Sequence, residues 1–186
     1  MVKLKILILF LMIGLNLKSQ DLESLRINPK KDFEFNSLIK SQNDTLEIVT
    51  CADYVLFPFG RFDNIDQIKA GLLSGFKIKS QRTDDSVYFY YDLVQTSNRL
   101  LISIDKDSEA SAHSNIVNGL IIESNVKTIN NITIGMTIDT FLDLHFKSYP
   151  TETKVKFKTI IFDYCVQGIK HIYKFDNSKL ISIEYK

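Results

Sequence analysis

The two halves of the chain carry the same order of local patterns, and this order restricts the fold more than any other feature. Asn64-Ile-Asp-Gln-Ile68 corresponds to Thr137-Ile-Asp-Thr-Phe141, Tyr88–Asp92 to Ile172–Asp176, and Leu101–Asp105 to Leu180–Glu184. Asn and Thr are favoured helix N-caps, and alternating apolar and polar residues are typical of strands with one covered face. Three matches in one order favour a duplication over chance similarity between two α+β halves.

These patterns predict an α+β fold made of two helix-plus-three-strand-meander units. Side by side, the meanders would form a largely antiparallel sheet with the helices on one face. We assign residues 45–122 to the first unit, 123–186 to the second, and 20–44 to a polar N-terminal arm. The helices are expected to begin at Asn64 and Thr137, and the strands to lie within 45–59, 76–79, 87–94, 100–105, 116–122, 154–161, 169–176 and 180–185.

The second half also resembles a known module. Gly135-Met-Thr137 at a helix start, Tyr173-x-Phe175 and Leu180-x-x-Ile183 are similar to the helix-plus-antiparallel-sheet repeat of bacterial outer-membrane assembly lipoproteins and β-lactamase-inhibitory proteins. The resemblance covers roughly residues 132–186 and, more faintly, 60–105. It implies a protein that acts by binding other proteins. The lipid-attachment cysteine of the lipoproteins has no counterpart near the N-terminus, and no contact residue is carried over.

The first 19 residues have the three parts of a secretory signal peptide. Two lysines precede the apolar stretch Ile6–Leu15, and Ser19 supplies a small residue at the predicted cut. A membrane anchor is the alternative, but the stretch is about ten residues whereas a spanning helix needs roughly 20. We therefore expect cleavage before Gln20 and export to the periplasm or the cell exterior, with no transmembrane segment remaining.

The charge balance gives no reason to expect a nucleic-acid partner. The formal net charge is +1, and the predicted signal peptide carries Lys3, Lys5 and Lys18 but no acidic residue, so the exported chain would be slightly acidic. Proteins that bind nucleic acid through its phosphates need a basic surface. With 13 Phe and 8 Tyr, the chain has ample material for a hydrophobic core.

The sequence contains two cysteines, Cys51 and Cys165. Export would permit a disulfide between them, and it would close a loop of about 115 residues. The alternative is two unpaired, buried thiols that act as small hydrophobic residues. Sequence alone cannot bring the two within bonding distance, so both interpretations stay open.

No catalytic motif stands out. The histidines are His113, His145 and His171, and the chain has no nucleophile elbow of the G-x-S-x-G type. His145 has apolar neighbours on its helix, and His171 shares a strand face with Tyr173 and Phe175. We interpret both as packed, hydrogen-bonded core histidines and His113 as a solvated loop residue. We assign no catalytic residue and expect no cofactor.

A run of carboxylates is the one candidate metal site. Asp105, Asp107 and Glu109 are spaced by two, and calcium takes oxygen ligands from such loops. The Gly and the distal Glu of an EF-hand are missing, and a strand end that enters a polar turn explains the same residues. We therefore assign no metal ligand.

The aromatic strand 87–94 carries the candidate binding residues. One face presents Phe89 and Tyr91 and suits a core, whereas the opposite face presents Tyr88, Tyr90 and Asp92. Tyrosine is enriched in interfaces because it buries a large area and keeps a polar tip. A strand covered on both faces, or tyrosines that stack on cross-strand neighbours, is the alternative.

Together these features predict an exported binding or interaction module of the cell envelope or exterior, whose partner is another protein. Two alternatives remain: a small secreted hydrolase whose site assembles only in the fold, and a structural envelope component. A pocket with convergent polar groups would favour the enzyme, and an exposed aromatic sheet face would favour binding.

Overall fold

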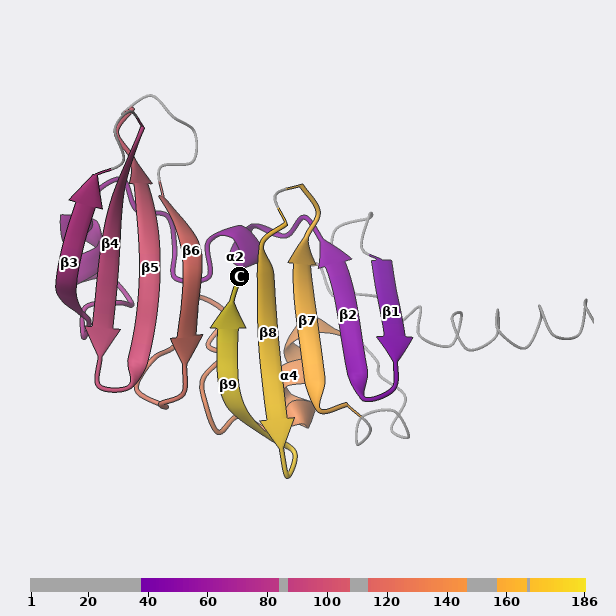
Figure 1. The fold of residues 1–186 in the computed structure, drawn as a ribbon. Coiled ribbons are helices and arrows are strands. Elements are labelled where there is room, and N and C mark those ends of the chain that lie inside the picture. Colours follow the sequence, from indigo (N-terminus) through magenta and orange to yellow (C-terminus); the bar gives the residue numbers. More distant parts are fainter. Residues whose placement is uncertain (1–37, 84–86, 108–113, 147–156, 167) are drawn as a thin grey trace, which may run out of the picture.

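The computed structural model describes residues 38–83, 87–107, 114–146, 157–166 and 168–186; for residues 38–41 it describes the backbone alone. The predicted signal peptide and most of the predicted arm lie outside the described residues. The described chain has an α+β fold with one nine-stranded sheet that is mostly antiparallel (Figure 1).

The strands are β1 (Leu38–Gln42), β2 (Thr45–Thr50), β3 (Lys77–Thr83), β4 (Tyr88–Gln95), β5 (Asn98–Asp105), β6 (Ser114–Ile121), β7 (Thr159–Tyr164), β8 (Lys170–Asp176) and β9 (Lys179–Tyr185). The helices of the described residues are α2 (Asp53–Leu56), α3 (Ile65–Ala70) and α4 (Ile138–His145). None of these helices has the length and apolar character that a membrane span requires.

The sheet order is β1-β2-β7-β8-β9-β6-β5-β4-β3. Strands β3 to β6 pair antiparallel in sequence order, and so do β7 to β9. The two sets meet where β6 pairs with β9 through three residue pairs, from Gly119↔Tyr185 to Ile121↔Ile183. The β1–β2 hairpin extends the sheet beyond β7, because β2 pairs with β7 in parallel.

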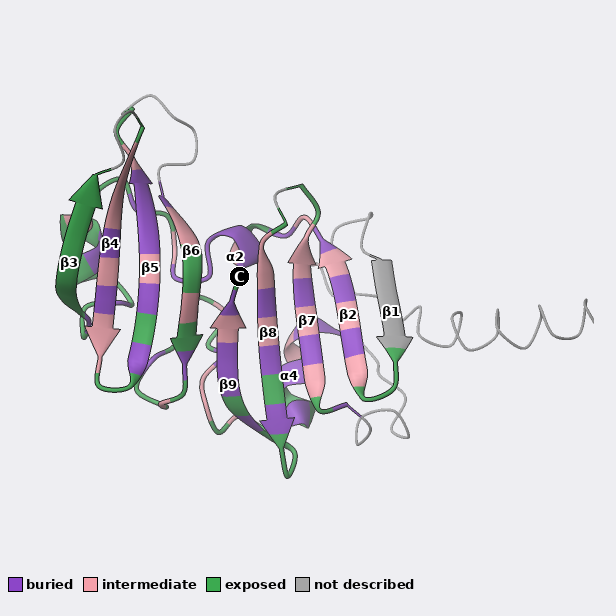
Figure 2. Cartoon of the chain, in the orientation of Figure 1, coloured by how far each residue is buried: buried purple, intermediate pink, exposed green. Residues whose placement is uncertain are grey.

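Buried residues alternate with half-buried or exposed ones along several strands (Figure 2), so the two faces of the sheet differ in burial. We call the face that carries Tyr91 and Tyr173 the inner face, and the face that carries Tyr90 and Glu184 the outer face; paired residues on neighbouring strands share a face. The inner face supplies most of the core from the strands: Leu46, Ile48, Tyr91, Leu93, Leu100, Ile102, Ile104, Ile121, Ile160, Phe162, Tyr173, Phe175, Leu180, Ile183 and Tyr185. Outer-face residues are mostly half-buried or exposed, and all seven residues of the edge strand β3 are exposed.

Helix α4 packs on the inner face of β7 and β8. The Phe141 ring lies 4.8 Å from that of Tyr173 and 5.8 Å from that of Phe162, between ring centroids. Both predicted N-caps are confirmed: the Asn64 side chain accepts the backbone N–H groups of residues 66 and 67, and the Thr137 hydroxyl accepts the N–H of residue 140. Each such cap stabilises its helix by about 1 kcal/mol.

Several predicted bounds are wrong. The strand expected within 45–59 ends at Thr50, and α2 follows, because the consecutive buried residues from Val55 to Phe59 cannot all face one side of a strand. Residues 38–42, assigned to the arm, form β1.

Two later strands also lie further along the chain than expected. The strand predicted at 76–79 extends to Thr83, because it pairs with β4 along most of its length after a bulge between Ile78 and Ser80. The strand predicted at 154–161 is β7, Thr159–Tyr164, and residues 154–156 lie outside the described residues. In β7 the buried side chains are Ile160 and Phe162.

Candidate functional site

The outer face of β4 presents the residues that the sequence predicts for binding. Tyr88, Tyr90 and Asp92 are each half-buried, whereas Tyr91 of the same strand faces inward and is buried. The rings of Tyr88 and Tyr90 lie 6.2 Å apart between centroids and meet edge to face at 61°. This is a favourable aromatic arrangement. The two tyrosines therefore form one partly exposed aromatic pair on the sheet surface.

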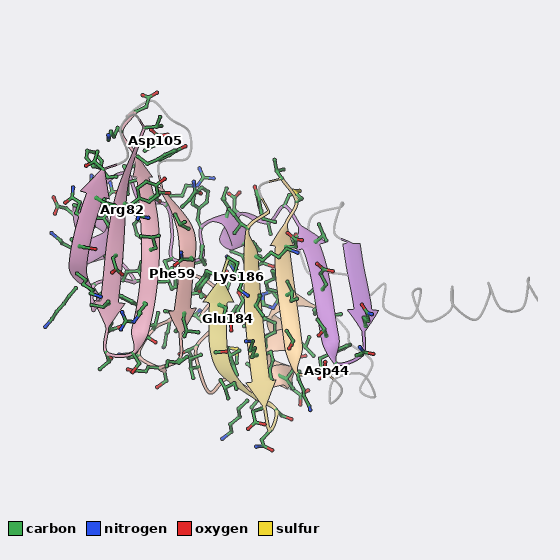
Figure 3. The ribbon with its side chains drawn as sticks, viewed as in Figure 1. Asp44, Phe59, Arg82, Asp105, Glu184 and Lys186 are labelled. Carbon is green, nitrogen blue, oxygen red and sulfur yellow. A yellow bond between two sulfur atoms is a disulfide. The ribbon has the colours of Figure 1, made fainter. Side chains whose placement is uncertain are left out.

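Arg82 of the edge strand β3 contacts one member of this tyrosine pair, Tyr90. Its guanidinium carbon lies 5.0 Å from the centroid of the Tyr90 ring, within the range of a cation–π contact (Figure 3 labels Arg82). The contact follows from register, because Arg82 pairs directly with Tyr90 across the β3–β4 ladder. The guanidinium places a positive charge over the Tyr90 ring at the surface.

An open groove of about 250 Å³ runs across the same face. Its lining comes from four adjacent strands, β3 to β6: Ser80, Arg82, Tyr90, Asp92, Leu101 and Asn118. The groove combines a cation, an anion, an amide, a hydroxyl, an aromatic ring and one aliphatic side chain. We call these six residues and Tyr88 the aromatic groove. Such a set can hydrogen-bond and pack against a polar, partly apolar surface.

Sequence reasoning identified three residues of the aromatic groove, Tyr88, Tyr90 and Asp92, and missed the others. Arg82 was missed because the strand expected at 76–79 stops short of it. Asn118 belongs to β6 and enters the groove only through its pairing with Leu101 of β5. Extending the predicted strand to Thr83 would have placed Arg82 opposite the tyrosines.

The histidines occupy the core rather than a cleft. His145 and His171 are each 1% exposed. The His145 Nδ1–H donates to the Phe141 carbonyl oxygen at 2.8 Å, and the Nδ1 of His171 lies 3.4 Å from the Tyr173 hydroxyl oxygen. Burial lowers the pKa of His171 to about 3, so its ring is neutral in the folded protein. His113 lies outside the described residues.

The carboxylate run has the geometry of a turn. The backbone N–H of Asp107 donates to the Asp105 carboxylate at 2.9 Å, and Glu109 lies outside the described residues. Within the described ranges, no group of three or more His, Cys, Asp or Glu side chains is placed to hold a metal ion.

The structure joins Cys51 and Cys165 in a disulfide. Cys51 directly follows β2 and Cys165 directly follows β7, and these strands pair in parallel up to Thr50↔Tyr164. The two Cα atoms are 5.1 Å apart, and the backbone N–H of Cys165 donates to the Thr50 carbonyl at 3.1 Å. The disulfide therefore fastens the β1–β2 hairpin to the rest of the sheet.

No protein-family model, no curated protein and no solved structure matches this chain.

Proposed function

We propose that this protein works by binding another protein through the aromatic groove on the outer face of its sheet. The observation that carries the proposal is the assembly of Tyr88, Tyr90 and Arg82 on a partly exposed sheet surface. Tyr and Arg are among the residues most often found to dominate interface energetics. The resemblance to envelope and inhibitory binding modules points in the same direction.

The tyrosine and arginine side chains of the groove are already ordered by the sheet, so they would lose little conformational entropy when a partner binds. Tyr90 has neighbours on both sides in the ladder, Arg82 on β3 and Ser103 on β5, and it also touches the Tyr88 ring. Side chains that are already ordered lose less freedom when a partner binds. The Asp92 carboxylate and the Arg82 guanidinium offer charges of both signs, which would fix the orientation of the partner.

The size of the surface indicates how far a partner would reach. Four strands about 4.8 Å apart, with seven residues in β3 and eight in each of β4, β5 and β6, present roughly 500 Å² of outer face. A stable interface commonly buries about 800 Å² on each partner. A partner centred on the aromatic groove would therefore extend across the β6–β9 junction, where Leu120 and Glu184 are paired.

Tyr88→Ala combined with Tyr90→Ala tests this proposal. Protein captured from the envelope or medium of the producing cells should be retained by the wild type and lost by the variant, since truncating interface anchors commonly weakens binding by 2 kcal/mol or more. A control is Val166→Ala, an exposed apolar residue in the turn after β7, away from the groove. It should capture as well as the wild type.

The melting temperature separates binding from folding. Both tyrosines are only half-buried, so their truncation should cost less than the loss of a buried aromatic side chain, and the tyrosine variant should stay folded with a modest drop in melting temperature. A large drop in melting temperature would instead identify these tyrosines as structural, since loss of a buried aromatic side chain costs about 3–5 kcal/mol.

We further propose that the protein is exported and arose by duplication of a helix-plus-meander unit. The disulfide supports export, because such bonds persist in oxidising compartments. The order of elements supports duplication: α3 precedes β3, β4 and β5, and α4 precedes β7, β8 and β9. Joined at β6 and β9, two such units make the sheet wide enough for a protein partner.

A further inference from the structure

A second hollow lies on the inner face of the sheet, on the opposite side of β4 from the aromatic groove. It is an open pocket of about 540 Å³, a size typical of small-molecule sites. Its lining comes from the start of α3, from β4, from the end of β5 and from the first residue after β5. The lining residues are Asp63, Asn64, Ile65, Phe89, Tyr91, Ile104, Asp105 and Lys106. Asp105 lies at the end of β5 (labelled in Figure 3).

The pocket has an apolar floor and a charged rim. Phe89 and Tyr91 are alternate residues of β4 and therefore point to the same face, and Ile65 and Ile104 complete the apolar lining. Asp63, Asp105 and Lys106 bring the charges, two negative and one positive.

A cation already lies over the aromatic floor. The Lys106 ammonium nitrogen is 5.1 Å from the centroid of the Phe89 ring, as in a cation–π contact. Lysine is long and flexible, and Lys106 is exposed, so its side chain can move aside without disturbing the core.

We propose that this pocket binds a small organic cation, an ammonium group attached to an aromatic or aliphatic body. The cation would take the place of the Lys106 ammonium over Phe89, and its body would pack on Tyr91 and Ile104. The aromatic faces carry negative electrostatic potential, which favours a positive ligand.

The charges around the pocket agree with this choice of ligand. Two of the lining residues are acidic, Asp63 and Asp105, and one is basic, Lys106; Asp105 lies at the edge of the pocket, because it pairs with Tyr88 of the outer face. Burial, and after it the negative charge of Asp66, raises the pKa of Tyr91. An anion would gain from Lys106 alone and would face the carboxylates.

The test is a titration of the ¹⁵N-labelled protein with benzyltrimethylammonium, followed by amide chemical shifts. Phenylacetate, an anion of similar body, is the comparison ligand. With the cation, saturable shifts should appear at the amides of Phe89, Tyr91 and Ile104. The anion should bind at least threefold more weakly, because a cation–π contact raises the affinity for the cation by about threefold or more.

Variants sharpen the test. Lys106→Gln should tighten binding of the cation about threefold, because it removes the competing ammonium. Lys179→Gln makes the same change of charge on the distant β8–β9 hairpin and should leave binding unchanged. Phe89→Leu should weaken binding about threefold, and Asp105→Asn should weaken it while keeping the oxygen that accepts from the Asp107 N–H.

Three results would overturn the proposal: shifts that never map to the pocket, equal or tighter binding of phenylacetate, and a Lys106→Gln variant that binds the cation no more tightly than Lys179→Gln does. The site is independent of the aromatic groove, so the Tyr88→Ala, Tyr90→Ala protein should bind the cation as the wild type does.

Discussion

Acidification should destabilise this fold through one buried histidine, His171. Its ring lies between Tyr173 and Tyr185, 4.7 Å from the Tyr185 ring centroid, and is 1% exposed. Burial lowers its pKa from 6.5 to about 3. Between these two values the unfolded chain binds a proton that the folded protein does not, so the free energy of unfolding falls as the pH falls below 6.5.

The magnitude follows from the width of that interval. Each pH unit below 6.5 removes about 1.4 kcal/mol, so going from pH 7 to pH 5 should remove about 2 kcal/mol through His171. Above pH 6.5 the histidine is neutral in both states and contributes no pH dependence. The loss continues down to about pH 3, where the folded protein begins to bind the proton as well.

Urea unfolding of the wild type and of His171→Phe at pH 7 and pH 5 measures this effect. Phenylalanine keeps an aromatic ring in the site and cannot be protonated. All other titrating groups are shared, so the pH-induced loss of stability should be about 2 kcal/mol smaller in the variant, whatever its stability at pH 7. Equal losses in the two proteins would show that His171 is not the group responsible.

Three further changes should lower the free energy of unfolding, each measured by urea unfolding at pH 7. Cys51→Ala with Cys165→Ala should cost about 4 kcal/mol, because 114 residues separate the bonded cysteines; a loss below 1 kcal/mol would contradict this. Gly119→Ala should cost about 1–3 kcal/mol, since a Cβ there would lie 2.4 Å from the Leu100 Cδ2 atom, and an unchanged stability would refute the clash. Asn98→Ala should cost about 2 kcal/mol, because its buried side chain accepts two backbone N–H groups of the loop after β6; a neutral result would mean that those amides find other acceptors.

Local signals made much of the fold predictable. The caps Asn64 and Thr137 were identified because a capping side chain bonds to amides two or three residues away, so the whole motif lies in one short stretch. The alternation along β4 correctly placed Tyr91 in the core and Tyr88 and Tyr90 on a partly exposed face, whereas Phe89, expected on the core face, is also half-buried. In both cases the deciding contacts lie within a few residues along the chain.

Features set by distant contacts could not be predicted. The parallel pairing of β2 with β7 joins residues more than a hundred positions apart, and no local pattern encodes it. The bond between Cys51 and Cys165 follows from that pairing, so the sequence left it open. Helix α2 is a single turn whose Val55 and Leu56 are buried, and such a short helix depends on tertiary packing rather than on propensity.

In the candidate site, too, the residues set by local sequence were predictable and those set by distant strand pairing were not. The tyrosine pair was predictable because one strand contains it. Arg82 and Asn118 join the groove through the register of β3 on β4 and of β6 on β5, and a shift of one residue in either would turn them to the other face.

Site-specific photocrosslinking tests the central claim, binding through the outer face, most directly. Tyr90→p-benzoylphenylalanine places a photoreactive ring in the aromatic groove, and Val166→p-benzoylphenylalanine places the same ring at an exposed control position in the turn after β7. On irradiation in the producing cells, position 90 should give one adduct of discrete mass that disappears when Arg82→Ala is added, and position 166 should give none. Absence of an adduct at position 90, or equal adducts at positions 90 and 166, would contradict a binding role for this face.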